Sequence, residues 1–387
     1  MVLLVNQHIV PVFSDIVNAF AERGRGPILF AGHIEKGGKP LSARIEIRRS
    51  TRYNRASSFS RFVTWLLFTI HYSFYLAFCR KPEFVLVTTN PPLAPIVTAW
   101  ISKLRNIPFY ILLYDLYPEA MLQADVVKEG NLIFHIWMKL NRSMFKNARH
   151  IFTLSESMKR AAGKYLTSDE KIRVISNWAD TSFIHPVPKA SNPFVKAHGL
   201  MGKFVVLYSG NMGLTHDLES LVEAAGKVRD LQQVVFVLIG DGGKRRILEQ
   251  LARSNKMDNV LFLPHQDENN FPLAMASADV GVVTLGNGAE GISVPSKTYV
   301  NLAAGLCLLG IAPGASELNR IIREHKVGFV CEPGRADEIE RTIRLLFNDR
   351  ELLQYHKDNA LKASRFFTSE KAYEYVNQTG SSLRVTL

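Results

Sequence analysis

Short apolar runs recur along the chain and alternate with longer segments whose apolar residues return every three or four positions. Each apolar run predicts a buried strand, and each longer segment predicts a helix. The runs of the first half are VLLV (2–5), PILF (27–30), FVLVTT (84–89), FYILLY (109–114), HIFTL (150–154) and IRVIS (172–176). The helices are expected at 15–23, 91–104, 131–147 and 155–165. This alternation is typical of a parallel sheet covered by helices on both faces.

The second half repeats the alternation, with strands predicted at FVVLYSG (204–210), VVFVLIGDG (234–242), VLFLP (260–264), VGVVTL (280–285) and LCLLGI (306–311). A chain of 387 residues exceeds what one core usually organises. Because residues 185–193 (HPVPKASNP) are rich in proline and small polar residues, we interpret them as a linker. We therefore predict an α/β fold with two doubly wound domains, 1–185 and 186–365. Residues 366–387 contain a late helix that either caps the second domain or crosses back onto the first.

Charge distinguishes the two halves. Residues 1–185 hold 24 Lys and Arg against 13 Asp and Glu, whereas residues 186–387 hold 23 against 22. The excess of +11 in the first half indicates that one domain faces a polyanion. Three scattered cysteines, Cys79, Cys307 and Cys331, suit neither a disulfide framework nor a zinc site, and the N-terminal ten residues lack the features of a signal peptide. A reducing cytosol fits this pattern best.

An aromatic segment, residues 62–79, directly follows the basic part of the first half. Fourteen of its 18 residues are apolar or aromatic, and six arginines opposed only by Glu46 lie within residues 44–61. A membrane-spanning helix here would separate the first strand from those after residue 84, so we expect a monotopic element lying among anionic lipid headgroups. The membrane-binding candidates are Arg48, Arg49, Arg52, Arg55, Trp65 and Phe68.

Two other interpretations of this segment remain open. A long core helix beside a solvated basic loop would give the same pattern. Nucleic acid is the weaker alternative, because no binding motif accompanies the charge and the aromatic residues form one block.

Loops rich in glycine or cations follow several predicted strands of the second half. Because the carboxyl ends of parallel strands share one edge of a sheet, we expect these loops to gather around an anion such as a diphosphate. Lysine side chains and helix N-terminal amides would hold it. The donor-binding candidates are Gly210, Asn211, Gly213, Lys244, Arg245, Glu290, Ser296, Lys297 and Tyr299.

The runs SGNMGLTHDLESLVEAA, VVFVLIGDGGKRRILEQLA and SVPSKTYVNLAAG resemble the C-terminal domain of family 4 glycosyltransferases, in the bacterial branch that builds O-antigen and capsule polysaccharides. YDLYPEA (114–120) and ISNWAD (175–180) are similar to the same branch. The resemblance covers most of residues 84–365. It implies the GT-B fold, in which two Rossmann-like domains face across a cleft and the C-terminal domain holds a nucleotide sugar, expected to be UDP-linked. Reaction would retain the anomeric configuration.

The resemblance also implies independence from metals and cofactors, and the chain has no Asp-x-Asp. One departure concerns the donor ribose. Many family members bind it through the second glutamate of a Glu-x(seven)-Glu motif, whereas the corresponding position here is Val300 and Glu290 is out of register.

Asp115 and Glu119 follow a predicted strand and are the catalytic candidates, to orient an acceptor hydroxyl or stabilise an oxocarbenium-like centre. Their alternative role is to cap a helix that begins near Pro118. The leading hypothesis is a retaining glycosyltransferase at the cytoplasmic face of the inner membrane, acting on a lipid-linked, polyprenyl diphosphate-type saccharide in surface polysaccharide synthesis. A nucleotide-sugar epimerase and a non-catalytic scaffold of a polysaccharide assembly complex are the alternatives.

Overall fold

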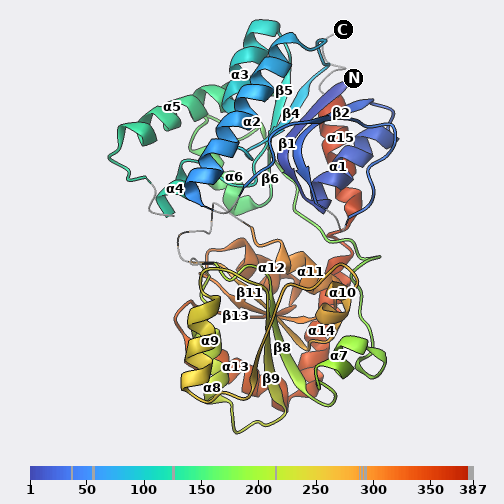
Figure 1. Cartoon of the computed structure of the whole chain (residues 1–387), viewed down its shortest axis with the longest axis vertical. Coiled ribbons are helices and arrows are strands. Elements are labelled where there is room, and N and C mark those ends of the chain that lie inside the picture. Colours follow the sequence, from blue (N-terminus) through green and yellow to red (C-terminus); the bar gives the residue numbers. More distant parts are fainter. Residues whose placement is uncertain are drawn as a thin grey trace. The chain divides into compact units, whose positions relative to one another are not determined.

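The computed structural model describes residues 1–35, 38–54, 57–123, 127–213, 216–286, 288, 291 and 294–381. They form two compact units (Figure 1). The first unit consists of Met1–Asn177, Gly291–Ser293 and Ser369–Leu387, and the second of Trp178–Glu290 and Val294–Thr368. The first boundary therefore falls eight residues before the sequence-based one.

A seven-stranded parallel sheet organises the first unit, in the order β3-β2-β1-β4-β5-β6-β7. Its strands are β1 (Val2–Ile9), β2 (Pro27–Ile34), β3 (Glu46–Arg49), β4 (Val85–Thr88), β5 (Phe109–Leu112), β6 (Ile151–Thr153) and β7 (Ile172–Val174). The chain moves outward from β1 to β3 and then returns to β4, so the topological switch point lies between β1 and β4. Ligands of such sheets bind outside the carboxyl ends of the strands at this point. The six predicted strands are confirmed; β3 was missed because all four of its residues are exposed and it carries no apolar run.

Helices cover this sheet. They are α1 (Pro11–Glu22), α2 (Ser58–Phe78), α3 (Ala94–Arg105), α4 (Glu119–Gln123), α5 (Leu132–Asn147), α6 (Glu156–Gly163) and α15 (Ala372–Ser381). Helix α15 comes from the far end of the chain and packs against α1, as the red helix in Figure 1 shows. Tyr110 donates its hydroxyl to the carbonyl of Thr379 at 3.2 Å, and the Tyr373 hydroxyl donates to Glu22. Of the two expected roles of the late helix, packing on the first unit is the one observed.

A six-stranded parallel sheet organises the second unit, in the order β10-β9-β8-β11-β12-β13. Its strands are β8 (Phe204–Ser209), β9 (Val234–Ile239), β10 (Val260–Leu263), β11 (Val280–Thr284), β12 (Cys307–Ile311) and β13 (Gly328–Cys331). The helices are α7 (Pro193–Ala197), α8 (Glu219–Lys227), α9 (Arg245–Ser254), α10 (Phe271–Ala276), α11 (Lys297–Ala303), α12 (Glu317–His325), α13 (Ala336–Asn348) and α14 (Arg350–Ser364). The switch point lies between β8 and β11. Both sheets confirm the predicted fold class.

The proline-rich segment 185–193, which we interpreted as a linker, lies inside the second unit and packs against its sheet. The ammonium of Lys189 lies 2.5 Å from a carboxylate oxygen of Asp279 and donates to the carbonyl of Lys203 at 2.9 Å. Asp279, at the start of β11, is 9% exposed and also accepts the amide of Val205 at 2.8 Å. This ion pair therefore fastens the segment to the centre of the second sheet.

Replacing Asp279 with alanine should lower the free energy of unfolding of the second unit by about 3 kcal/mol, because the buried Val205 amide would lose its acceptor and the half-buried Lys189 ammonium its carboxylate partner. Urea unfolding followed by circular dichroism measures the change. The matched control is Asp337→Ala, which removes an exposed partner of Lys227 and should change little. Equal stability of the Asp279 variant and the parent would show that the pair does not anchor the segment.

Candidate functional site

A cavity of about 230 Å³ opens at the carboxyl edge of the second sheet. Ser209 and Gly210 come from the end of β8, His265 and Gln266 follow β10, and Lys297 begins α11. The rest of its wall is formed by Phe271, Met275, Ser296, Val300 and Asn301. The cavity thus lies beside the switch point between β8 and β11, where ligands of parallel sheets bind.

Lys297 is the cation of this cavity. Its ammonium donates to the Tyr208 hydroxyl at 2.7 Å and lies 4.2 Å from the centre of the same ring. Among the described residues no carboxylate lies within ion-pair distance of it. Burial lowers its pKa from 10.5 to about 8. The site therefore contains a desolvated positive charge that an anionic ligand would neutralise.

Gly210 makes room for that lysine. A Cβ atom at this position would lie 2.3 Å from Cε of Lys297, and the φ angle of Gly210 is +139°. The lysine side chain consequently crosses the end of β8 directly over the backbone. Any residue with a side chain would push Lys297 away from the cavity wall.

Gly240 and Gly242 lie where two loops of the second unit pack on each other. A Cβ atom on Gly240 would lie 2.0 Å from the Gly210 carbonyl oxygen, and one on Gly242 would lie 2.5 Å from that of Met212. The Met212 amide donates to Asp241 and the Lys244 amide to Met212. These glycines let residues 210–213 and 240–244 pack on each other, so the close backbone approach that they permit is made between the two loops.

Lys244 and Lys297 belong to one hydrogen-bonded chain. The Tyr208 hydroxyl links Lys297 to Nδ1 of His216, 2.9 Å away, and Lys244 donates to the His216 carbonyl at 2.7 Å. Burial, and then the charges of both lysines, lower the pKa of His216 to about 4, so this imidazole is neutral at physiological pH. Lys244 also pairs with Glu219 at 2.8 Å. Its charge is already balanced, which makes Lys297 the stronger anion-binding candidate.

Arg245 is committed to the fold. It pairs with Glu249 at 2.9 Å and donates to the carbonyls of Gly240 and Leu263, which end β9 and β10. Its guanidinium therefore ties two strand ends together, and the prediction that it holds the donor is not supported by this geometry.

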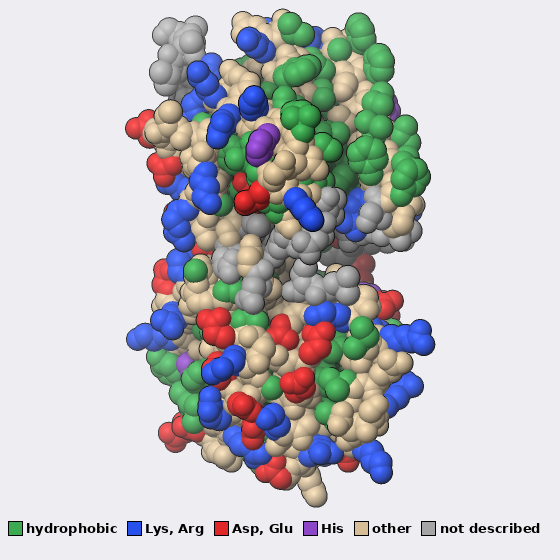
Figure 2. Space-filling view, turned by 90° about the vertical axis from the view of Figure 1, so that its left-hand side faces the viewer, with side chains coloured by type: hydrophobic (Ala, Val, Ile, Leu, Met, Phe, Trp, Pro, Cys, Tyr) green, Lys and Arg blue, Asp and Glu red, His purple; other side chains and the backbone are tan. Residues whose placement is uncertain are grey.

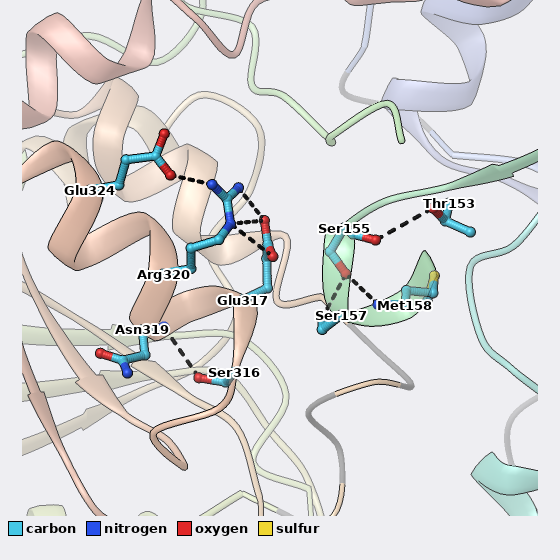
Figure 3. Close-up of polar contacts among 9 residues, drawn as sticks. All are labelled: Thr153, Ser155, Ser157, Met158, Ser316, Glu317, Asn319, Arg320 and Glu324. Carbon is cyan, nitrogen blue, oxygen red and sulfur yellow. Dashed lines mark hydrogen bonds and ion pairs between the residues drawn. The ribbon is translucent and has the colours of Figure 1, made fainter. Parts of the chain in front are cut away.

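The helix N-termini at this edge are largely occupied by the chain itself. Asp217 accepts the Ser220 amide at the start of α8, and Ser316 accepts the Asn319 amide at the start of α12 (Figure 3). Glu317, 3% exposed, adds its carboxylate to the first turn of α12 and pairs with Arg320. At α11 the amides of Thr298 and Tyr299 already donate to Pro295 and Ser296. Of the two expected kinds of anion-binding group, lysine side chains and helix amides, these contacts leave the Lys297 side chain as the stronger candidate.

The remaining donor candidates differ in position. Ser296 lines the cavity; Asn211 and Gly213 lie in the loop beside it, where the Asn211 carbonyl accepts the Tyr208 hydroxyl at 2.6 Å. Tyr299 is buried and packs on Phe367, so its assignment as a donor contact is wrong. Val300 lines the cavity, and Glu290 lies outside the described residues.

Sequence reasoning missed three polar members of this wall, His265, Gln266 and Asn301. Asn301 reaches the cavity because β11 carries Gly281, where a Cβ atom would lie 2.6 Å from Oδ1 of Asn301. His265 and Gln266 directly follow a predicted strand, and that position was the available signal. Within the described residues, no three His, Cys, Asp or Glu side chains form a potential metal site.

In the first unit, Asp115 follows β5, and the Thr89 hydroxyl accepts its backbone amide at 3.3 Å. Burial raises the pKa of its carboxyl to about 6. Glu119 accepts the Tyr165 hydroxyl at 2.6 Å, and burial also raises its pKa. Glu119 begins α4. With a pKa of about 6, Asp115 is the carboxylate better suited to exchange a proton near neutral pH. Glu119 is hydrogen-bonded to Tyr165.

A second cavity of about 640 Å³ lies at the carboxyl ends of β1 and β2, and sequence reasoning missed it. His8 approaches Glu35 to 2.6 Å and stacks on His33, with the ring centres 5.6 Å apart. Arg52, Tyr53, Asn54 and Thr64 complete its wall. Gln7 donates to the carbonyl of Thr51 at 3.1 Å, directly before Arg52. His8 therefore belongs to a polar cluster with Glu35, His33 and Arg52.

The membrane-binding candidates are only partly exposed. Arg48, Arg49 and Arg52 are exposed, with Arg48 paired to Glu46, and Arg55 lies outside the described residues. Phe68 is fully buried against Phe30, so its assignment to the membrane is wrong. Trp65 is half-buried and stacks on Tyr53. Within the described part of the chain, no helix is both long and apolar enough to cross a membrane.

Residues 192–363 match the family model described as glycosyl transferases group 1. "Probable glycosyltransferase WbjE" of Pseudomonas aeruginosa is 27% identical over 270 residues, which are 68% of this chain and 66% of that protein. WcaI of Escherichia coli (strain K12), whose name describes a glycosyl transferase of colanic acid biosynthesis, is 26% identical over 249 residues, 63% of this chain and 61% of that one. The chain thus matches less than two thirds of the length of either relative.

The fold has counterparts among solved structures. The crystal structure of Anabaena Alr3699/HepE in complex with UDP superimposes with a TM-score of 0.73 at 18% sequence identity. The superposition covers 98% of this chain and 99% of that one. At this identity the likeness concerns the fold, which is the GT-B arrangement of two Rossmann-like domains.

Replacing Lys297 with methionine should stabilise the ligand-free protein at pH 7 by about 1–2 kcal/mol, because it removes a charge whose burial is uncompensated. The folded pKa of about 8 lies below the ordinary 10.5, so the unfolded chain binds the extra proton between these values. The free energy of unfolding of the parent therefore rises between pH 8 and 10.5. The stability advantage of the Lys297→Met variant over the parent disappears across the same range. Urea unfolding at pH 7 and 10 measures both, with the exposed Lys196→Met as control. A variant less stable than the parent at pH 7 would contradict the uncompensated charge.

Proposed function

We propose that the chain transfers a sugar from a nucleoside diphosphate sugar to a lipid-linked saccharide. The match of residues 192–363 to the glycosyl transferases group 1 model supports this proposal. The single observation that carries this proposal is Lys297, a buried ammonium without a carboxylate partner among the described residues, at the wall of a cavity beside the sheet's switch point. A departing nucleoside diphosphate develops negative charge, and a desolvated cation stabilises it far better than water does.

UDP is the proposed nucleotide. The Anabaena structure with a similar fold contains UDP, as its name states. Lys297 would contact the diphosphate, and His265, Gln266 and Asn301 offer polar groups to the rest of the donor. Val300, which stands in the cavity wall in place of the expected ribose-binding glutamate, offers no hydrogen bond. The ribose would therefore be held by the side-chain amide of Gln266 or Asn301 or by the imidazole of His265.

The proposed reaction retains the anomeric configuration. The bond between the anomeric carbon and the diphosphate breaks, the acceptor oxygen bonds to that carbon from the same face, and the acceptor proton passes to the departing diphosphate. No carboxylate lines the described wall of the cavity beside Lys297, so we assign no covalent intermediate. Protein cations stabilise the leaving group in this scheme, and it requires neither a divalent metal nor a cofactor.

For the acceptor we propose a saccharide carried on a polyprenyl diphosphate, used in surface polysaccharide synthesis. The name of WcaI links one relative to colanic acid. The 640 Å³ cavity at β1 and β2 offers Arg52, Tyr53 and the paired His8 and Glu35 to a polar acceptor group. The excess of +11 charges in the first half favours a peripheral position at the cytoplasmic face of the inner membrane.

The direct test combines the protein with a panel of nucleotide sugars and a lipid-linked oligosaccharide fraction. We expect one nucleotide sugar to raise the melting temperature and its labelled sugar to enter the lipid extract, with and without EDTA. An epimerised donor formed without acceptor would favour the epimerase instead. A scaffold would bind no nucleotide sugar, and either result would overturn the transferase proposal.

Replacing Lys297 with glutamine should lower turnover at least about 100-fold, since the charge that faces the leaving group is lost. The melting temperature should stay at or above that of the parent, which separates this effect from unfolding. Lys196→Gln on the exposed surface is the control and should keep full activity. Unchanged turnover in the Lys297 variant would remove this residue from the site.

A further inference from the structure

Helix α2 presents an uncovered apolar stripe. Phe62, Leu66, Ile70, Phe74 and Phe78 follow one another at every fourth position and are all exposed, Phe78 to 82%. The opposite side of the helix carries the buried Phe68, Tyr72 and Leu76, which pack toward the sheet. An amphipathic surface helix normally exposes polar residues, so this helix is apolar on both sides and only one side is covered.

Two neighbouring helices extend the stripe. Helix α3 packs beside α2, and α5 beside α3. Trp100 and Leu104 on α3 are 65% and 86% exposed, and Leu132 at the start of α5 is 71% exposed, with Ile133 and Ile136 close behind. In Figure 2 hydrophobic side chains gather along one side of the first unit. We name the exposed apolar residues of α2, α3 and α5 the apolar face; soluble monomers seldom leave so many large side chains uncovered together.

The charge on these helices has one sign. Helices α2, α3 and α5 contain no Asp or Glu; their charged residues are Arg61, Lys103, Arg105, Lys139, Arg142 and Lys146. Arg105 is used inside the unit, where it donates to the carbonyl of Cys79 at 2.8 Å. The others are exposed. A second copy of the chain would bring these like charges together, whereas an anionic surface would complement them.

We propose that the apolar face is a docking surface for an anionic lipid bilayer, with α2, α3 and α5 lying in the headgroup region and their lysines and arginines against lipid phosphates. None of the described helices can cross a membrane, so these helices lie in the interface. The inference rests on one part of the proposed function, the peripheral position at a membrane, and makes that part more specific. It does not depend on the sugar-transfer reaction. It replaces the sequence-based set built on Trp65 and Phe68.

Vesicle flotation tests the proposal with the whole protein. We expect it to float with vesicles of 70% phosphatidylcholine and 30% phosphatidylglycerol, and at least tenfold less with pure phosphatidylcholine or in 1 M NaCl. Tryptophan emission should shift to shorter wavelength on binding, and brominated lipid should quench it. Both signals should largely disappear in Trp100→Phe, because Trp100 is the exposed tryptophan of this face.

The double variant Phe74→Ser, Phe78→Ser should lose at least tenfold in vesicle affinity while keeping the melting temperature, because both side chains are exposed. Ile247→Ser, an exposed apolar position on α9 of the second unit, is the matched control and should bind like the parent. Transfer to a short water-soluble acceptor should stay unchanged in the double variant, so failure here is distinguishable from failure of the transferase proposal. The proposal would be overturned if the parent did not float or if the variant floated equally well. It would also be overturned if the parent were a dimer in solution and the double variant a monomer.

Discussion

A positive charge held inside the second unit constrains the architecture around it. Lys297 loses most of its hydration, and among the described residues its ammonium contacts the hydroxyl and the ring of Tyr208 but no carboxylate. Folding tolerates this because α11 fixes the lysine at its first residue and Gly210 leaves the space above β8 free. In the proposed function, the negative charge of a bound diphosphate would offset the free-energy cost of burying this lysine.

Most strand positions in both units could be predicted, because strands buried in a parallel sheet consist of consecutive apolar residues. The two strands that were missed, β3 and β13, are short and lie at the sheet edges. Lys297 was a donor-binding candidate because it was expected at a helix start near a strand end, and the structure places it in the wall of the cavity. The functions of Gly240, Gly242 and Arg245 could not be predicted, since the sequence does not tell whether a loop approaches a ligand or its neighbouring loop.

In the first unit, contacts between residues far apart in the sequence could not be predicted either. His8 and Glu35 are 27 positions apart, and Arg52 comes from the segment after β3. The parallel pairing of β1 with β2, and of β2 with β3, brings these segments together. Gly32 permits this assembly, because a Cβ atom there would lie 2.3 Å from the carbonyl oxygen of Thr51. In the aromatic segment the sequence analysis selected Phe68 for the membrane, but Phe68 faces the core, whereas Phe74 and Phe78 face outward.

The most direct measurement is the proton uptake that accompanies UDP binding, obtained by calorimetric titration at pH 8.5 in buffers of different ionisation enthalpy. Free Lys297, with a pKa of about 8, is largely neutral at this pH, and a bound diphosphate must raise that pKa. The account predicts uptake of a substantial fraction of one proton, absent from the Lys297→Met variant, together with affinity that falls as pH rises through 8. Binding without proton uptake, or with equal uptake in the variant, would contradict it.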